Sequence, residues 1–225
     1  MRERGGGRQR RRRAVATSIT ALASLISAGL PLAAGASAER GLETIVEHIA
    51  RVVVQTAPVS DDGMLVALVG VQTGTTSGRV IVLGDSGSGW RTLARLSVSE
   101  FPIVPATPVQ IAHATGDQRP DFLVLVAAAD NTPGVVVGQI GGRWQLIRNA
   151  GPFPASPYVA RNPRFLRNRL VSQYDDCRPN CASGTTTSID WTFDAARGEF
   201  IAPNPPGWVA PAGALNHRAA EPAGV

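Results

Sequence analysis

The sequence predicts an all-β fold of three antiparallel, four-stranded repeat units that follow an N-terminal signal helix. Three observations predict this fold. From residue 52 onward, short runs rich in β-branched residues alternate with clusters of Gly, Pro, Asp and Ser. Large aromatic residues close three similar segments at Trp90, Trp144 and Phe200, 54 and 56 residues apart. A basic and then apolar leader precedes all of them.

The leader, residues 1–38, has the three parts of a secretory signal. The basic run Arg8–Arg13 is followed by an uncharged stretch, Ala14–Ala34, and then by the small-x-small sequence Ala36-Ser37-Ala38. This pattern predicts cleavage after Ala38 and a secreted, extracellular mature chain. An uncleaved anchor is the alternative, because 21 uncharged residues can just span a bilayer.

The basic character of the chain belongs to this leader. The formal charge is +5, all 22 basic residues are Arg, and seven of them lie in the first 13 residues. Without those seven and Glu3, 15 Arg face 16 acidic residues. The composition therefore predicts no nucleic-acid partner. We expect an extracellular or cell-envelope ligand, and no stable membrane association after cleavage.

Residues 39–202 are expected to form the β-repeat domain. It opens with a helical face, since Leu42, Ile45, Val46 and Ile49 recur at helical spacing. The predicted strands are 52–54, 64–71, 79–83, 90–98, 109–113, 122–128, 135–140, 144–148, 165–174, 185–191 and a short run at 200. Residues 203–225 are rich in Pro and Ala, which predicts a flexible tail.

The segment 112–124 reads Ala-His-Ala-Thr-Gly-Asp-Gln-Arg-Pro-Asp-Phe-Leu-Val. It resembles the FG-GAP/VCBS repeat family, in which a T-G-D-G-x-x-D loop precedes an apolar strand. The resemblance implies β-propeller blades, often with calcium held by the acidic loop. Asp117 and Asp121 match two of the acidic positions, whereas His113 and Gln118 stand where the family has Asp and Gly.

Calcium prefers six to eight oxygen ligands, and two carboxylates with a His supply too few. We therefore expect no resident cofactor, and calcium at Asp117 and Asp121 is the alternative. His113 beside these carboxylates is also a candidate general base, although a loop His bonded to its neighbours explains the same residues.

Cys177 and Cys181 are the only cysteines. An exported chain meets an oxidising compartment, so we expect a structural disulfide between them that fixes a loop of the third unit. A redox-active pair is the alternative, although the spacing departs from C-x-x-C.

The sequence Gly84-Asp85-Ser86-Gly87 resembles the nucleophile segments of chymotrypsin-like proteases and SGNH esterases. Either family needs a positioned base. His48 lacks the protease surroundings, and His217 lacks the Asp three residues before it that the esterases carry. A hairpin turn explains the same residues, because Gly, Asp and Ser are turn formers.

The mature chain has one basic cluster, in which Tyr158 and Phe165 lie among Arg161, Arg164, Arg167 and Arg169. Such a cluster can meet an anionic polymer, although a solvated loop is the plainer interpretation. The sequence as a whole predicts a secreted, non-catalytic binding or envelope-associated protein. The alternative is an exported, SGNH-like serine hydrolase that uses Ser86.

Overall fold

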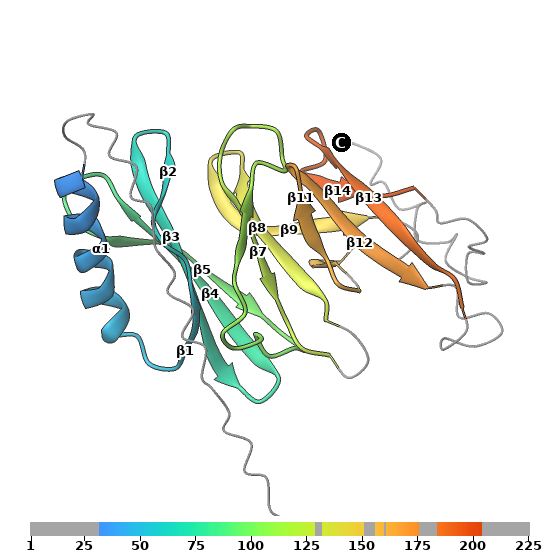
Figure 1. The fold of residues 1–225 in the computed structure, drawn as a ribbon, viewed down its shortest axis with the longest axis horizontal. Helices are drawn as coiled ribbons and strands as arrows, with labels where there is room; N and C mark the ends of the chain where they lie inside the picture. Colours follow the sequence, from blue (N-terminus) through green and yellow to red (C-terminus); the bar gives the residue numbers. More distant parts are fainter. Residues whose placement is uncertain (1–31, 129–131, 151–155, 160, 176–183, 204–225) are drawn as a thin grey trace, which may run out of the picture. The chain divides into compact units, whose positions relative to one another are not determined.

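The fold is almost entirely β, as predicted (Figure 1). The computed structural model describes residues 32–128, 132–150, 156–159, 161–175 and 184–203. Most of the leader, both cysteines and the tail beyond residue 203 lie outside the described residues.

The described chain begins with helix α1, Leu32–Glu47, and strand β1, Val52–Gln55. The predicted helical face is confirmed, because Leu42 is fully buried and Ile45, Val46 and Ile49 pack beside it. The helix begins earlier than the sequence indicated, so that the predicted cleavage position, Ala38, lies within it.

The first unit is a meander of four antiparallel strands: β2 Val59–Asp61, β3 Met64–Gly74, β4 Ser77–Asp85 and β5 Arg91–Val98. β1 also pairs with β3 and completes a five-stranded sheet. The centre of β3 is buried on both faces, since residues 66–69 are all inaccessible to solvent. A continuous apolar run of this kind is typical of a strand covered on both sides.

The second unit repeats the meander with β6 Gln110–Ala112, β7 Asp121–Leu125, β8 Gly134–Ile140 and β9 Arg143–Ala150. A short strand, β10 Tyr158–Val159, pairs with the start of β8. Gly141 and Gly142 form the two-residue turn between β8 and β9 with φ of 58° and 76°. A turn with two positive φ values matches the twist of the strands it joins, which is why Gly is favoured there.

The third unit contains β11 Arg164–Leu166, β12 Arg169–Asp175, β13 Thr186–Asp194 and β14 Glu199–Ile201. The strand predicted over 165–174 is therefore two strands, because Arg167 and Asn168 form a turn with φ of 49° and 59°. β14 pairs in parallel with β9, which joins the second and third units into one nine-stranded sheet.

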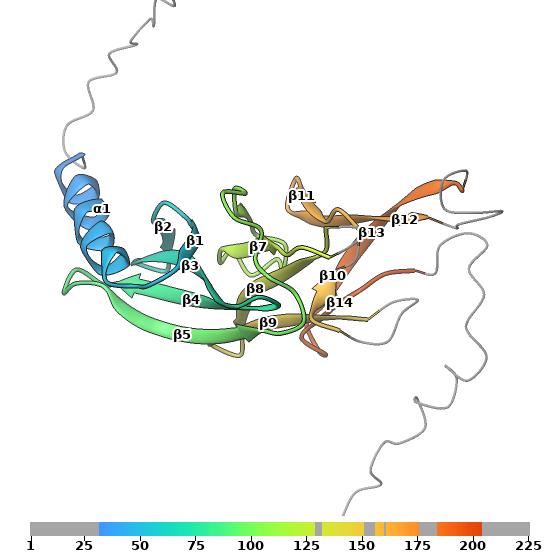
Figure 2. The same cartoon turned by 90° about the horizontal axis from the view of Figure 1, so that it is seen from below.

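Three apolar clusters hold these layers together. The first lies between α1 and one face of the first sheet, and the second lies between the other face and the second unit. The third lies between the opposite face of the second unit and the third unit, as the nine-stranded sheet bends back on itself. Figure 2 shows α1 against the first sheet on the side away from the second unit.

The three closing aromatic residues occupy equivalent places in these layers. Trp90 packs toward α1, Trp144 toward the first unit and Phe200 toward the second unit. Each ring therefore covers the preceding layer. The repeat in the sequence thus corresponds to a repeat in packing.

Candidate functional site

The loop between β6 and β7 is the segment with the T-G-D sequence. Asp121 Oδ2 accepts hydrogen bonds from the backbone N–H of Thr115 at 2.8 Å and from its hydroxyl at 3.0 Å. Asp117 Oδ1 accepts the backbone N–H of Arg119 at 3.0 Å and lies 3.0 Å from the same hydroxyl. His113 Nδ1 is bonded to the carbonyl oxygen of Arg119 at 2.8 Å. The two predicted acidic residues therefore meet at Thr115 and close the loop on itself.

Asp121 is almost completely buried, with 1% of its surface exposed, at the first position of β7. Burial raises the pKa of its carboxyl to about 6, although the hydrogen bonds from Thr115 act in the opposite direction. Its Oδ1 atom has no hydrogen-bond partner. That oxygen lies against Gly138, where a Cβ atom would come within 2.4 Å of it. The glycine makes room for the carboxyl group.

This loop does not fit a calcium ion. Asp121 gives one oxygen to Thr115, and the other is enclosed against β8, while Asp117 is held by backbone and hydroxyl donors. Within the described ranges, no group of three or more His, Cys, Asp or Glu side chains is placed to hold a metal. Calcium needs more oxygen ligands than this geometry offers.

A second polar group, which the sequence did not indicate, joins the first two units. Asp61, at the end of β2, is buried, and its Oδ2 accepts a hydrogen bond from Gln139 Nε2 at 3.0 Å. Gln139 Oε1 in turn accepts from Arg119 Nη1, and Arg119 Nη2 lies 3.5 Å from Asp62 Oδ2. Burial raises the pKa of Asp61, and the positive charge of Arg119 partly offsets this rise. The guanidinium group thus ties the acidic hairpin of the first unit to the second.

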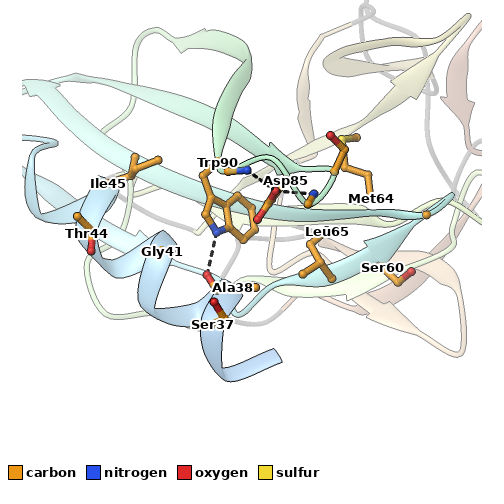
Figure 3. Close-up of a pocket in the computed structure, with 14 residues that line it drawn as sticks. Ser37, Ala38, Gly41, Thr44, Ile45, Ser60, Met64, Leu65, Asp85 and Trp90 are labelled. Carbon is orange, nitrogen blue, oxygen red and sulfur yellow. Dashed lines mark hydrogen bonds between the residues drawn. The ribbon is translucent and has the colours of Figure 1, made fainter. Parts of the chain in front are cut away.

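Ser86 lies in the turn between β4 and β5, as the turn interpretation predicts. The carboxylate of Asp85 accepts the backbone N–H groups of Gly87 at 2.7 Å and Gly89 at 2.9 Å. Trp90 follows, and its indole N–H donates to the carbonyl oxygen of Ala38 in α1 at 2.8 Å. Figure 3 shows the indole ring between the turn and the helix.

A shallow depression of about 930 Å³ lies over this turn, between α1 and the β2–β3 hairpin (Figure 3). Its lining includes the hydroxyl-bearing residues Ser37, Thr44, Ser60 and Ser86. No His lines it. His48 lies beyond the end of α1, where its Nδ1 is bonded to the carbonyl oxygen of Thr44 at 2.6 Å. His217 lies outside the described residues.

The arginine cluster lies on the hairpin of β11 and β12. Arg164, Arg167 and Arg169 are exposed, and Arg169 Nη1 pairs with Asp190 Oδ2 at 3.3 Å. Phe165 instead points into the core between the second and third units. The predicted disulfide residues, Cys177 and Cys181, lie outside the described residues.

No family model, curated protein or solved structure matches this chain. The resemblance of residues 112–124 to FG-GAP/VCBS repeats thus stays a prediction. Within the part of the chain that the structure describes, no helix is long and apolar enough to cross a membrane.

Proposed function

We propose that this chain is an exported, non-catalytic binding protein that recognises an extracellular or cell-envelope ligand through its surface. The observation that carries this proposal is that the Asp85 carboxylate is hydrogen-bonded within its own turn. Its carboxylate holds the backbone of the turn around Ser86 through two N–H groups, at 2.7 and 2.9 Å. A serine hydroxyl is a weak nucleophile without a positioned base. The residue beside Ser86 is thus engaged in folding the turn.

The other candidate catalytic groups support the same conclusion. His113 is bonded to a backbone carbonyl group of its own loop, and Asp121 is enclosed beneath that loop. Both residues keep the β6–β7 connection closed. Long charged side chains, by contrast, are presented to solvent on the β11–β12 hairpin. Recognition by such surface loops on a rigid sheet scaffold is a common arrangement in β proteins.

The proposal also includes the interpretation of the three meanders as propeller-like blades. Three four-stranded meanders follow one another, and each closing aromatic residue packs on the preceding layer. This is the behaviour expected of blade-like units. α1 lies where a preceding blade would pack, which gives the first unit a cover without a closed ring of blades.

Labelling with a fluorophosphonate probe, followed by intact-mass measurement, tests the proposal. The exported chain is expected to gain no adduct, and the Ser86→Ala variant serves as the matched control. A stoichiometric adduct on the wild-type protein that disappears in Ser86→Ala would contradict a non-catalytic role. The same mass spectrum, compared with the fully reduced chain, shows whether Cys177 and Cys181 are joined.

An exported hydrolase that uses Ser86 is the second candidate, and one observation favours it. Ser86 lines the depression beside α1, where a small acyl substrate would find room. This function requires a base that approaches Ser86 from residues outside the described ranges. It predicts ester hydrolysis that is lost in Ser86→Ala.

A further inference from the structure

The β11–β12 hairpin combines exposed positive charge with exposed apolar side chains. Among the described residues, the large hydrophobic side chains classed as exposed are Leu166, at 45%, and Ile111, at 39%. Leu166 ends β11, and Ile111 is the middle residue of β6. These two strands are neighbours, because the backbone N–H of Phe165 donates to Gln110 Oε1 at 2.8 Å. We call Ile111, Arg164, Leu166 and Arg167 the basic hairpin surface.

The positive charges of this surface are available to a ligand. No acidic side chain within the described residues forms an ion pair with Arg164 or Arg167, whereas Arg169 is paired with Asp190. Arg164 and Leu166 are two residues apart in a strand, so they share one face, and Phe165 between them points into the core. Leu166 is thus flanked by two guanidinium groups on the solvent side.

Arg167 occupies a costly backbone conformation. Its φ of 49° lies in the left-handed region, at a turn position where Asn, Asp and Gly are preferred. A non-glycine residue there is strained unless it is Asn or Asp. The fold thus carries a long cationic side chain at the tip of a hairpin where a small residue would be more stable.

We propose that the basic hairpin surface docks reversibly on an anionic phospholipid bilayer. Guanidinium groups bind phosphate with two parallel hydrogen bonds, and a flanking apolar side chain can enter the region between headgroups and acyl chains. An anionic polysaccharide would satisfy the arginines but would leave Leu166 and Ile111 in water. The pairing of charge with apolar side chains therefore favours a lipid surface.

This inference rests on the proposed function, because it names the envelope component that an exported binding protein would meet. It leaves in place the expectation of no stable membrane association after cleavage, because the contact proposed here is reversible. The contact expected here is peripheral and sensitive to salt, since it depends on exposed charges. It needs no spanning helix.

Sedimentation with vesicles tests the docking. The exported protein is mixed with phosphatidylcholine vesicles that contain about one-third phosphatidylglycerol, and with vesicles of phosphatidylcholine alone. We expect binding to the anionic vesicles that weakens as salt is raised, and none to the neutral ones. Equal binding to both kinds of vesicle, or binding that salt leaves unchanged, would contradict the proposal.

The double variant Arg164→Gln/Arg167→Asn removes both charges. It should lower the apparent affinity about tenfold to thirtyfold, because each basic residue near an anionic surface contributes about fivefold. Asn is favoured in the turn that Arg167 occupies, so the variant should fold at least as well as the wild type. The matched control, Arg91→Gln/Arg143→Gln, removes two exposed arginines from the starts of β5 and β9 and should bind like the wild type. Equal losses in both variants would overturn the assignment to the hairpin.

The variant Leu166→Ser separates a bilayer from an anionic polymer. It keeps all charges but removes the apolar side chain, and it should weaken vesicle binding severalfold while leaving binding to soluble heparin unchanged. Unchanged vesicle binding would show that charge alone determines the binding, which would overturn the lipid proposal. If the protein binds no vesicles and also gains no fluorophosphonate adduct, only the lipid proposal is contradicted. An adduct on Ser86 contradicts the proposed non-catalytic function itself.

Discussion

At the scale of single residues, the pKa of the Asp121 carboxyl departs clearly from its ordinary value. One carboxyl oxygen is satisfied by Thr115, and the other lies without a partner against Gly138. A buried carboxyl group is more stable in its neutral form, which is why its pKa rises to about 6. The acidic loop that resembles a calcium site is therefore organised around hydrogen bonds.

This raised pKa makes the stability of the fold depend on pH. In the unfolded chain the carboxyl titrates near 3.8, so the folded form holds the proton more tightly between about pH 4 and 6. The free energy of unfolding that Asp121 contributes is fully present below pH 4 and is lost as pH rises through about 6. The loss is on the order of 2 to 3 kcal/mol.

Asp121→Asn should remove this dependence. Urea unfolding at pH 4, 5, 6 and 7 should show that the wild-type protein loses stability relative to the variant across this range. Asp190→Asn, which changes an exposed carboxylate, is the control and should keep the wild-type slope. Parallel profiles for wild type and Asp121→Asn would show that Asp121 is not held in its neutral form.

Sequence reasoning identified Asp121 but not its surroundings. The T-G-D sequence is local, so Thr115, Asp117 and Asp121 are close because the loop is short. Asp61 and Gln139 are 78 residues apart and come from different units. Nothing in either segment indicates the other. Such contacts depend on how the sheets pack, which periodicity does not specify.

At the scale of elements, α1 shows what the spacing of apolar residues predicts about a helix and what it does not. The spacing of Leu42, Ile45, Val46 and Ile49 gave the apolar face, because those residues recur once per helical turn. It did not give the start of the helix, since the preceding residues belong equally well to a signal segment. A leader pattern and a helix N-terminus overlap in these residues.

Leu42 is a buried residue of α1 that packs on the first sheet. It is 2% exposed among Ala67, Val69 and Leu83 of the first sheet. Leu42→Ala should cost about 2 to 4 kcal/mol in the free energy of unfolding, because it leaves a cavity beneath the helix. Glu43→Ala, at the next and exposed position, should change it by less than about 0.5 kcal/mol.

Hydrogen exchange checks where this loss occurs. Residues 37–47 should lose protection in Leu42→Ala, while the amides of the second and third units keep theirs. Equal stabilities for the two variants would mean that α1 does not cover the sheet in solution.

In the hairpin of β11 and β12, by contrast, the sequence pattern predicted the wrong element. The run from 165 to 174 is rich in apolar residues and contains no Gly or Pro, so a single strand was expected. Arg167 and Asn168 nevertheless turn the chain with two positive φ values. Asn is a known turn residue, but Arg at positive φ is rare, and the turn signal was therefore weak. The basic surface was visible in the sequence as a charge cluster, whereas its apolar partners, Leu166 and Ile111, were not.

At the scale of the whole described domain, the question is what covers the outer faces of the two sheets. α1 covers the outer face of the first sheet with Leu42 and its neighbours. The outward-facing residues of β13, Ser188, Asp190 and Thr192, are polar and exposed, while Ile189 and Trp191 between them are buried. Stacked repeats end in this way, with a cap at one end and a polar surface at the other.

In the part of the chain that the structure describes, little exposed apolar surface is left for a second copy. Within the described residues, the large exposed hydrophobic side chains are Ile111 and Leu166 on neighbouring edge strands. Two side chains are far less apolar surface than a stable dimer buries. We therefore expect a monomeric domain in which α1 covers the outer face of the first sheet.

Sedimentation equilibrium of the purified protein, over a wide range of concentration and without lipid, tests this claim most directly. We expect the mass of one chain at every concentration. A stable dimer would contradict this expectation, because it would require an interface larger than the exposed apolar surface of the described residues provides.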